Sequence, residues 1–228
     1  DAKATLQKGV YGLFNFGGSL GMTEKPTVTY SPLQGDRFIQ RVLSPLSLKN
    51  VVLLFHSGWS IERIFRLCFQ QINNLKNAPG ASGPTPSIAP DFRKFASAIK
   101  FLRNLQVQDA INISYQEVKG HPQLNLHIDE DYRTSEDAKQ FAFLIKVKPG
   151  KTRYVLTFSL DPAKDNQIKV ATRSLLGIMF YLSQAVEVPN QDILQSKVTQ
   201  TKTPEGDVFD WKEMTGDLLR IRSVSEKP

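Results

Sequence analysis

DAINISYQEVKGHPQLNLHIDE, residues 109–130, holds the clearest structural pattern in the chain. In its first half Ile111 and Ile113 alternate with polar neighbours, and in its second half Leu124 and Leu126 do the same. A period of two places successive side chains on opposite faces of a β-strand, so each half predicts a strand with one buried face. The Gly and Pro residues between the halves predict a tight turn. The stretch therefore predicts two half-buried strands that form a hairpin.

The residues that follow repeat this order of elements. The predicted elements are a helix over residues 135–146, an alternating strand over 154–160, a turn over 161–166, a short strand over 168–170 and a helix over 172–185. The buried face predicted for the last helix comprises Leu175, Ile178, Met179 and Leu182. Strand-strand-helix thus occurs twice in residues 110–186. Such hairpins bury their apolar faces under helices, so the sequence predicts an α+β fold of antiparallel hairpins with helices on one face.

Helical patterns also precede this region. Apolar residues recur at helical spacing in residues 61–75, after the possible N-cap Ser60, and in residues 92–105, after Pro90. A shorter helix is predicted for residues 36–43. The helices therefore come first and the predicted hairpins second.

Composition divides the chain into four parts that can all pack as one domain. Residues 1–76 hold an extended segment rich in glycine and aromatic residues, followed by the helical region. Residues 77–90 are rich in Pro and Gly and predict a linker or a long surface loop. The α+β domain occupies residues 91–188. Residues 189–228 are polar, and Trp211 is an apolar anchor that we expect to dock this segment.

The net charge of +7 is confined to the first half of the chain. Residues 1–110 hold 13 Lys and Arg against 6 Asp and Glu, whereas the remaining residues are balanced. Excess cations can attract nucleic acid, anionic lipid or an acidic protein. However, Arg93 and Lys94 are the only adjacent cations in this half, and no polybasic run marks a dedicated polyanion site. We therefore do not expect nucleic acid as the main partner.

The sequence itself contains few signals of the cellular compartment. No stretch approaches the roughly 18 apolar residues that a membrane-spanning helix needs. The sequence starts at Asp1 without Met or an apolar leader, so we expect any targeting segment to have been removed or left out. The single cysteine, Cys68, excludes an intrachain disulfide. An apolar content of 40% supports a core without one.

The best candidate for catalysis is His56, which follows the apolar run 51–55 and precedes Ser57. A strand that leads into His-Ser-Gly has a superficial likeness to the oxyanion loop of serine hydrolases. These enzymes carry their nucleophile in Gly-x-Ser-x-Gly, which the chain lacks. Cys68 lies on the apolar stripe of its predicted helix, where we expect it to pack and its pKa to rise. No catalytic residue is assigned, and a hydrolase site near His56 stays an alternative.

Metal ions and cofactors are not predicted. Possible metal ligands gather in residues 121–131, where His127 and Asp129 share one face of a predicted strand. Alternation already explains both as solvent-facing residues, and no second group of His or Cys at zinc spacing occurs. The glycine-rich stretch 16–21 lacks the Lys-Ser/Thr of a phosphate-binding loop.

Several stretches carry a resemblance to a known family. They are KPTVTYSPLQGDRF (25–38), SGWSIERIFRL (57–67) with the following Ile72-Asn73, RSLL (173–176) and VEVP (186–189). On these residues the chain resembles uncharacterised bacterial lipoproteins of the cell envelope over most of its length. The resemblance implies a domain on the periplasmic side, attached to the membrane by a lipid-bearing cysteine upstream of residue 1. It implies no reaction.

These observations favour a non-enzymatic envelope protein that binds protein partners or forms part of an assembly. An exposed strand can accept another strand, which would allow such units to associate. The alternative is a binder of anionic surfaces, such as lipid headgroups, polysaccharide or nucleic acid, through the basic first half. The cations predicted for anion or partner contact are Arg37, Arg41, Arg63, Arg66, Arg93 and Lys94.

Overall fold

The computed structural model describes residues 35–159, 165–216, 218 and 219. All the described residues belong to one compact unit, so the Pro- and Gly-rich segment 77–90 lies inside this unit. The extended segment predicted near the N-terminus lies outside the described residues.

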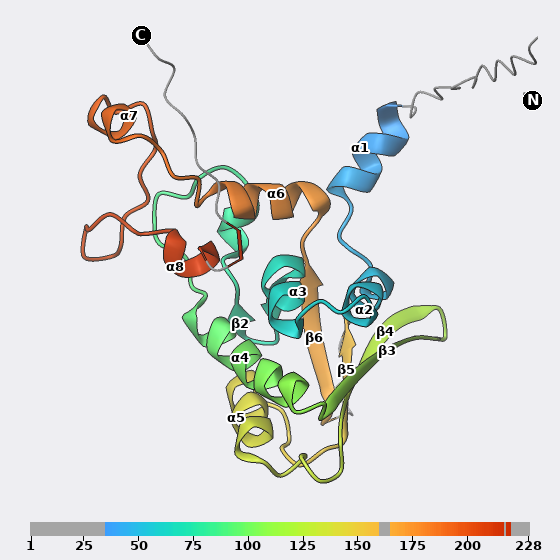
Figure 1. The fold of residues 1–228 in the computed structure, drawn as a ribbon. Helices are drawn as coiled ribbons and strands as arrows, with labels where there is room; N and C mark the ends of the chain where they lie inside the picture. Colours follow the sequence, from blue (N-terminus) through green and yellow to red (C-terminus); the bar gives the residue numbers. More distant parts are fainter. Residues whose placement is uncertain (1–34, 160–164, 217, 220–228) are drawn as a thin grey trace, which may run out of the picture. The chain divides into compact units, whose positions relative to one another are not determined.

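Helices and one mixed sheet make up the described unit, which confirms the α+β fold. The helices are α1 (Gly35–Leu43), α2 (Leu48–His56), α3 (Ile61–Cys68), the 3-10 helix η1 (Pro79–Ser82), α4 (Arg93–Val107), α5 (Glu136–Ile145), α6 (Leu175–Ser183), α7 (Asn190–Leu194) and α8 (Lys212–Thr215). The strands are β1 (Phe69–Ile72), β2 (Leu75–Lys76), β3 (Ile111–Val118), β4 (His121–Ile128), β5 (Arg153–Thr157) and β6 (Gln167–Thr172). They form one sheet in the order β2-β1-β6-β5-β4-β3, and α3 and α4 lie in front of it in Figure 1.

The predicted hairpin is confirmed as β3 and β4. The strands pair antiparallel over their whole length, beginning with Ile111 opposite Ile128. Side chains alternate between the core and solvent, so that Ile111 is buried and Asn112 is exposed. Lys119 and Gly120 between the strands have φ angles of 52° and 78°. Two positive φ angles in succession are typical of a two-residue hairpin turn.

The second predicted hairpin is wrong. β5 and β6 run parallel, with Val155 opposite Gln167 and Thr157 opposite Lys169. Side-chain alternation indicates which residues face the core, but it is the same for both strand directions. On its other side, β6 pairs antiparallel with β1.

Two apolar runs in the first third of the chain differ from their predictions. Residues 51–55 belong to α2 instead of a strand, and Ser47 caps this helix by accepting a hydrogen bond from the Asn50 N–H at 3.3 Å. A short apolar run has no period that separates a strand from a buried helix. The helix predicted for residues 61–75 ends at Cys68, and the chain continues as β1.

The main core lies between the sheet and helices α2 to α5. α4 buries Phe95, Ile99 and Leu102, as its pattern predicts, and these residues share one cluster with Leu124 and Tyr154 of the sheet. A smaller cluster anchors the C-terminal segment, which confirms the role predicted for Trp211. Its aromatic and methionine members are Phe92, Tyr181, Phe209, Trp211 and Met214.

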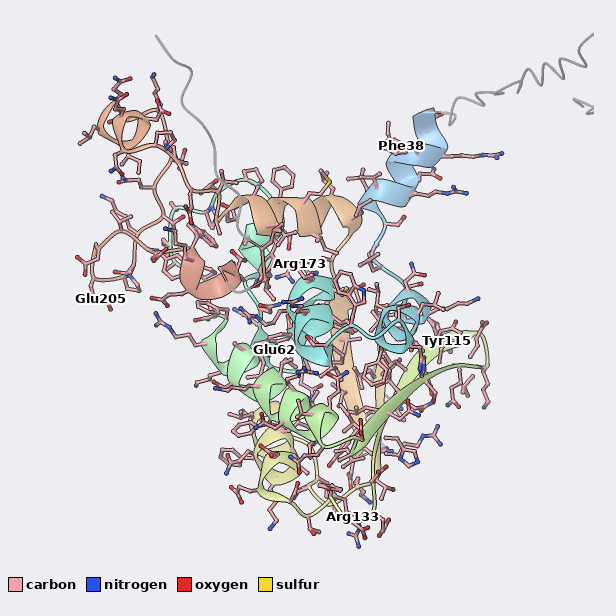
Figure 2. The ribbon with its side chains drawn as sticks, in the orientation of Figure 1. Phe38, Glu62, Tyr115, Arg133, Arg173 and Glu205 are labelled. Carbon is pink, nitrogen blue, oxygen red and sulfur yellow. The ribbon has the colours of Figure 1, made fainter. Side chains whose placement is uncertain are left out.

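The guanidinium of Arg173 joins α3, η1 and α6, and it lies between α3 and α6 in Figure 2. Arg173 is only 1% exposed. It donates hydrogen bonds to the backbone oxygens of Arg66 (3.0 Å), Leu67 (3.2 Å), Phe69 (2.7 Å) and Asn77 and to Oγ of Ser82 (2.9 Å). Its charge therefore meets carbonyl oxygens at the point where α3 ends.

The end of α3 explains how this cation can be buried. The last carbonyls of a helix have no donors within the helix and carry partial negative charge, so a cation there is stabilised. The ring of Tyr181 lies 4.0 Å from the guanidinium carbon and adds a cation–π contact. Burial lowers the pKa of Arg173 to about 10, which keeps the side chain charged at neutral pH.

We expect Arg173→Met to destabilise the protein by about 3 kcal/mol, because several buried carbonyl oxygens lose their donor. Urea unfolding followed by circular dichroism measures this loss as a lower midpoint. Arg93→Met is the matched control, since the Arg93 guanidinium is exposed and its ion pair with Glu213 lies in solvent. Equal midpoints for the two variants would contradict the role given to Arg173.

Candidate functional site

α6 exposes part of the face that its pattern predicts as buried. Leu175 is 48% and Met179 59% exposed, whereas the buried residues of this helix are Gly177 and Tyr181. α6 carries no charged residue, so periodicity could not select a buried face. The contact of Tyr181 with Arg173 fixes the rotation of the helix and leaves Leu175 and Met179 outward.

Exposed apolar side chains also occur on α1, which contacts α6 and lies beside it in Figure 1. We call five of them the α1–α6 surface. They are Phe38 (50% exposed), Ile39 (54%), Leu43 (54%), Leu175 (48%) and Met179 (59%). Single exposed apolar residues are ordinary on a protein surface, but a group of large ones on two adjoining helices is typical of an interaction site.

α1 has no buried residue. Helical spacing places Phe38, Ile39 and Leu43 on one side of this helix, and Arg37 and Arg41 lie next to that side. Figure 2 labels Phe38 on α1. The helix thus offers an apolar face that is bordered by Arg37 and Arg41 on one side and by Asp36 on the other.

The six predicted cations do not form one exposed group. Arg37, Arg41 and Arg63 are exposed, and so is Lys94 at the start of α4. Arg66 is 6% exposed, which removes it from contact with an outside anion. The remaining cation, at position 93, is paired with Glu213 at 2.8 Å.

Arg66 instead makes contacts within the protein. Its guanidinium pairs with Glu62 at 3.1 Å and donates a hydrogen bond to the Met214 carbonyl oxygen at 2.6 Å. These contacts connect α3 to α8. The sequence could not distinguish Arg66 from Arg63, because Met214, the residue that accepts the buried hydrogen bond of Arg66, lies far away in the chain.

His56 and Ser57 lie side by side in the chain but have separate partners. Nε2 of His56 is 3.0 Å from the carbonyl oxygen of Ile113, and the Ser57 hydroxyl donates to the Leu53 carbonyl at 2.8 Å. Ser57 ends α2, so it does not stand on the sharp strand-to-helix turn that a hydrolase nucleophile uses.

The contact of His56 lies at the free edge of the sheet. Ala110 accepts a hydrogen bond from the Asp129 N–H, so along β3 the residues of even number bond to β4 and Ile113 turns its backbone groups away from β4. Its carbonyl meets His56, and its N–H donates to Oδ1 of Asn112 at 2.7 Å. Two side chains therefore occupy the outward groups at this point of the edge.

Cys68 is buried at the end of α3, as its place on the apolar stripe predicts. Burial raises the pKa of its thiol to about 12, and the nearby charge of Arg173 opposes this rise only in part. A thiol that stays protonated is a poor nucleophile. Cys68 therefore acts as a packing residue.

The thiol of Cys68 should be almost inert in the folded protein. With a pKa of about 12, about one thiol in ten thousand is ionised at pH 8, compared with about one in ten at the ordinary pKa of 9.0. We expect 5,5′-dithiobis(2-nitrobenzoate) to react at least about 1,000-fold more slowly with native protein than with urea-unfolded protein. Since the chain has one cysteine, the release of thionitrobenzoate measures this residue alone. Rapid reaction of native protein would contradict the burial.

Within the described ranges, no three His, Cys, Asp or Glu side chains gather to hold a metal ion, and Nδ1 of His127 lies 2.6 Å from the Thr152 carbonyl oxygen. The helices in the same ranges are too short or too polar to cross a bilayer. Comparison of the chain with protein-family models, with curated proteins and with solved structures found no match. The resemblance to cell-envelope lipoproteins stays a prediction.

Proposed function

We propose that this chain is a non-enzymatic component of the bacterial cell envelope that docks on a protein partner through the α1–α6 surface. The chain is held on the periplasmic side by a lipid anchor upstream of residue 1, as its resemblance to envelope lipoproteins implies. The observation that carries the proposal is the exposure of α6, an apolar helix whose Leu175 and Met179 face outward.

The short length of α1 and its lack of buried residues support a partner at this surface. Isolated helices shorter than about 12 residues are marginally stable in water, and α1 has nine residues with none buried. A partner that covers Phe38, Ile39 and Leu43 would remove large apolar groups from water, which stabilises both the helix and the complex. Docking therefore completes a helix that the chain supports weakly by itself.

Charge defines the chemistry of the partner. Arg37 and Arg41 border the apolar face of α1, and the one acidic residue of this helix is Asp36. A partner with an apolar helical face flanked by Asp or Glu would match both features. An anionic bilayer is the competing surface, because an apolar face beside arginines is also typical of helices that lie on membranes.

The chemical alternatives have less support. His56 and Ser57 are bonded to different backbone oxygens, and the Cys68 thiol has a raised pKa. These groups serve the packing of α2 and α3. The proposal accordingly assigns no catalytic residue, cofactor or metal ion.

Photo-crosslinking in native envelopes tests the proposal. We expect p-benzoyl-phenylalanine in place of Met179 or Phe38 to give one discrete protein adduct after irradiation. Leu194 of α7 is the matched control, because it is 83% exposed and lies outside the α1–α6 surface. Position 194 should not give this adduct.

The variant Leu175→Glu tests the α1–α6 surface in a second way. A carboxylate at the centre of an apolar contact should reduce the adduct from position 179 by at least about tenfold, whereas Leu194→Glu should leave it unchanged. Circular dichroism verifies that both variants fold. Adducts with lipid alone, or equal protein adducts from position 194, would contradict a protein partner at this surface.

A further inference from the structure

A second feature, separate from the α1–α6 surface, is a cavity of about 840 Å³ along α5. Its buried and half-buried apolar lining residues, which we call the floor, are Leu75, Ala142, Leu144 and Val147. Phe143 also lines the cavity and is 76% exposed. The volume lies within the range of small-molecule sites, roughly 300–1,000 Å³.

Three lysines line the same cavity. Lys94 comes from the start of α4, Lys139 from α5 and Lys146 from the residue that follows α5. The one carboxylate among the lining residues is Glu136, which already accepts a hydrogen bond from Gln140 at 2.6 Å. In the described part of the chain the three lysines form no ion pair, so the mouth of the cavity has an excess of positive charge.

We propose that this cavity binds a long-chain fatty acid, with the acyl chain along the apolar floor and the carboxylate among Lys94, Lys139 and Lys146. Ammonium groups bind a carboxylate through charge-assisted hydrogen bonds. An acyl chain carries no polar group to desolvate, whereas a peptide would place amides against Leu75, Leu144 and Val147, which cannot hydrogen-bond them. The bound chain also covers the ring of Phe143.

Fluorescence titration of the folded protein with cis-parinarate, followed by displacement with palmitate, tests this site. We expect one site per chain with a dissociation constant on the order of micromolar. Phe143→Ser and the double variant Lys139→Glu/Lys146→Glu should each weaken binding by about tenfold or more. All three positions are exposed, so these variants should remain folded, which circular dichroism verifies.

Matched controls separate this cavity from general surface adsorption. Phe38→Ser and Lys100→Glu change an exposed aromatic residue and an exposed lysine that do not line it, and both should retain full affinity. Hexadecylamine, which has a cationic head, should fail to displace cis-parinarate. Three results would overturn the proposal: displacement by hexadecylamine as effective as by palmitate, displacement by poly-glutamate, or unchanged affinity in either cavity variant.

Discussion

The hydrogen bonds from Arg173 to the carbonyl end of α3 are the contact on which the placement of α6 depends. A cation can remain in this interior because the helix end supplies partial negative charge and the backbone oxygens accept its donors. The same guanidinium meets η1 through Ser82 and α6 through Tyr181. Once Tyr181 is fixed on this group, Leu175 and Met179 must face outward. The proposed docking surface is thus a consequence of how a buried charge is stabilised.

The sequence predicts most of the helices and strands, but it predicts fewer of the strand directions and of the contacts between elements. Alternation identifies β3 and β4, and helical spacing identifies α4 and α5, because a single face of each element is buried. The parallel direction of β5 and β6 could not be predicted, since alternation is independent of direction. The apolar run 51–55 in α2 has neither a strand period nor a helical period, so its helix could not be predicted from the sequence.

The candidate site residues are predicted correctly where the local pattern decides their environment, and they are not where a distant contact decides it. Cys68 is predicted correctly because its apolar neighbours already indicate burial. Arg66 resembles any other surface arginine until its contact with Met214, which lies 148 positions later, is known. One signal for the exposed face of α6 was present: residues 175–182 contain no charged side chain, so any outward face would be apolar. Lys139 and Lys146 belong to α5 and its C-cap, but Lys94 comes from α4, so only the fold shows that the three lysines line one cavity.

The occupied backbone groups of Ile113 affect how copies of this protein can associate. An edge strand with free N–H and C=O groups acts as a template for open-ended polymerisation. A second chain that adds to β3 here must first displace the imidazole of His56 and the amide of Asn112. These contacts oppose strand addition at this point of β3, whereas large apolar side chains of α1 and α6 are exposed.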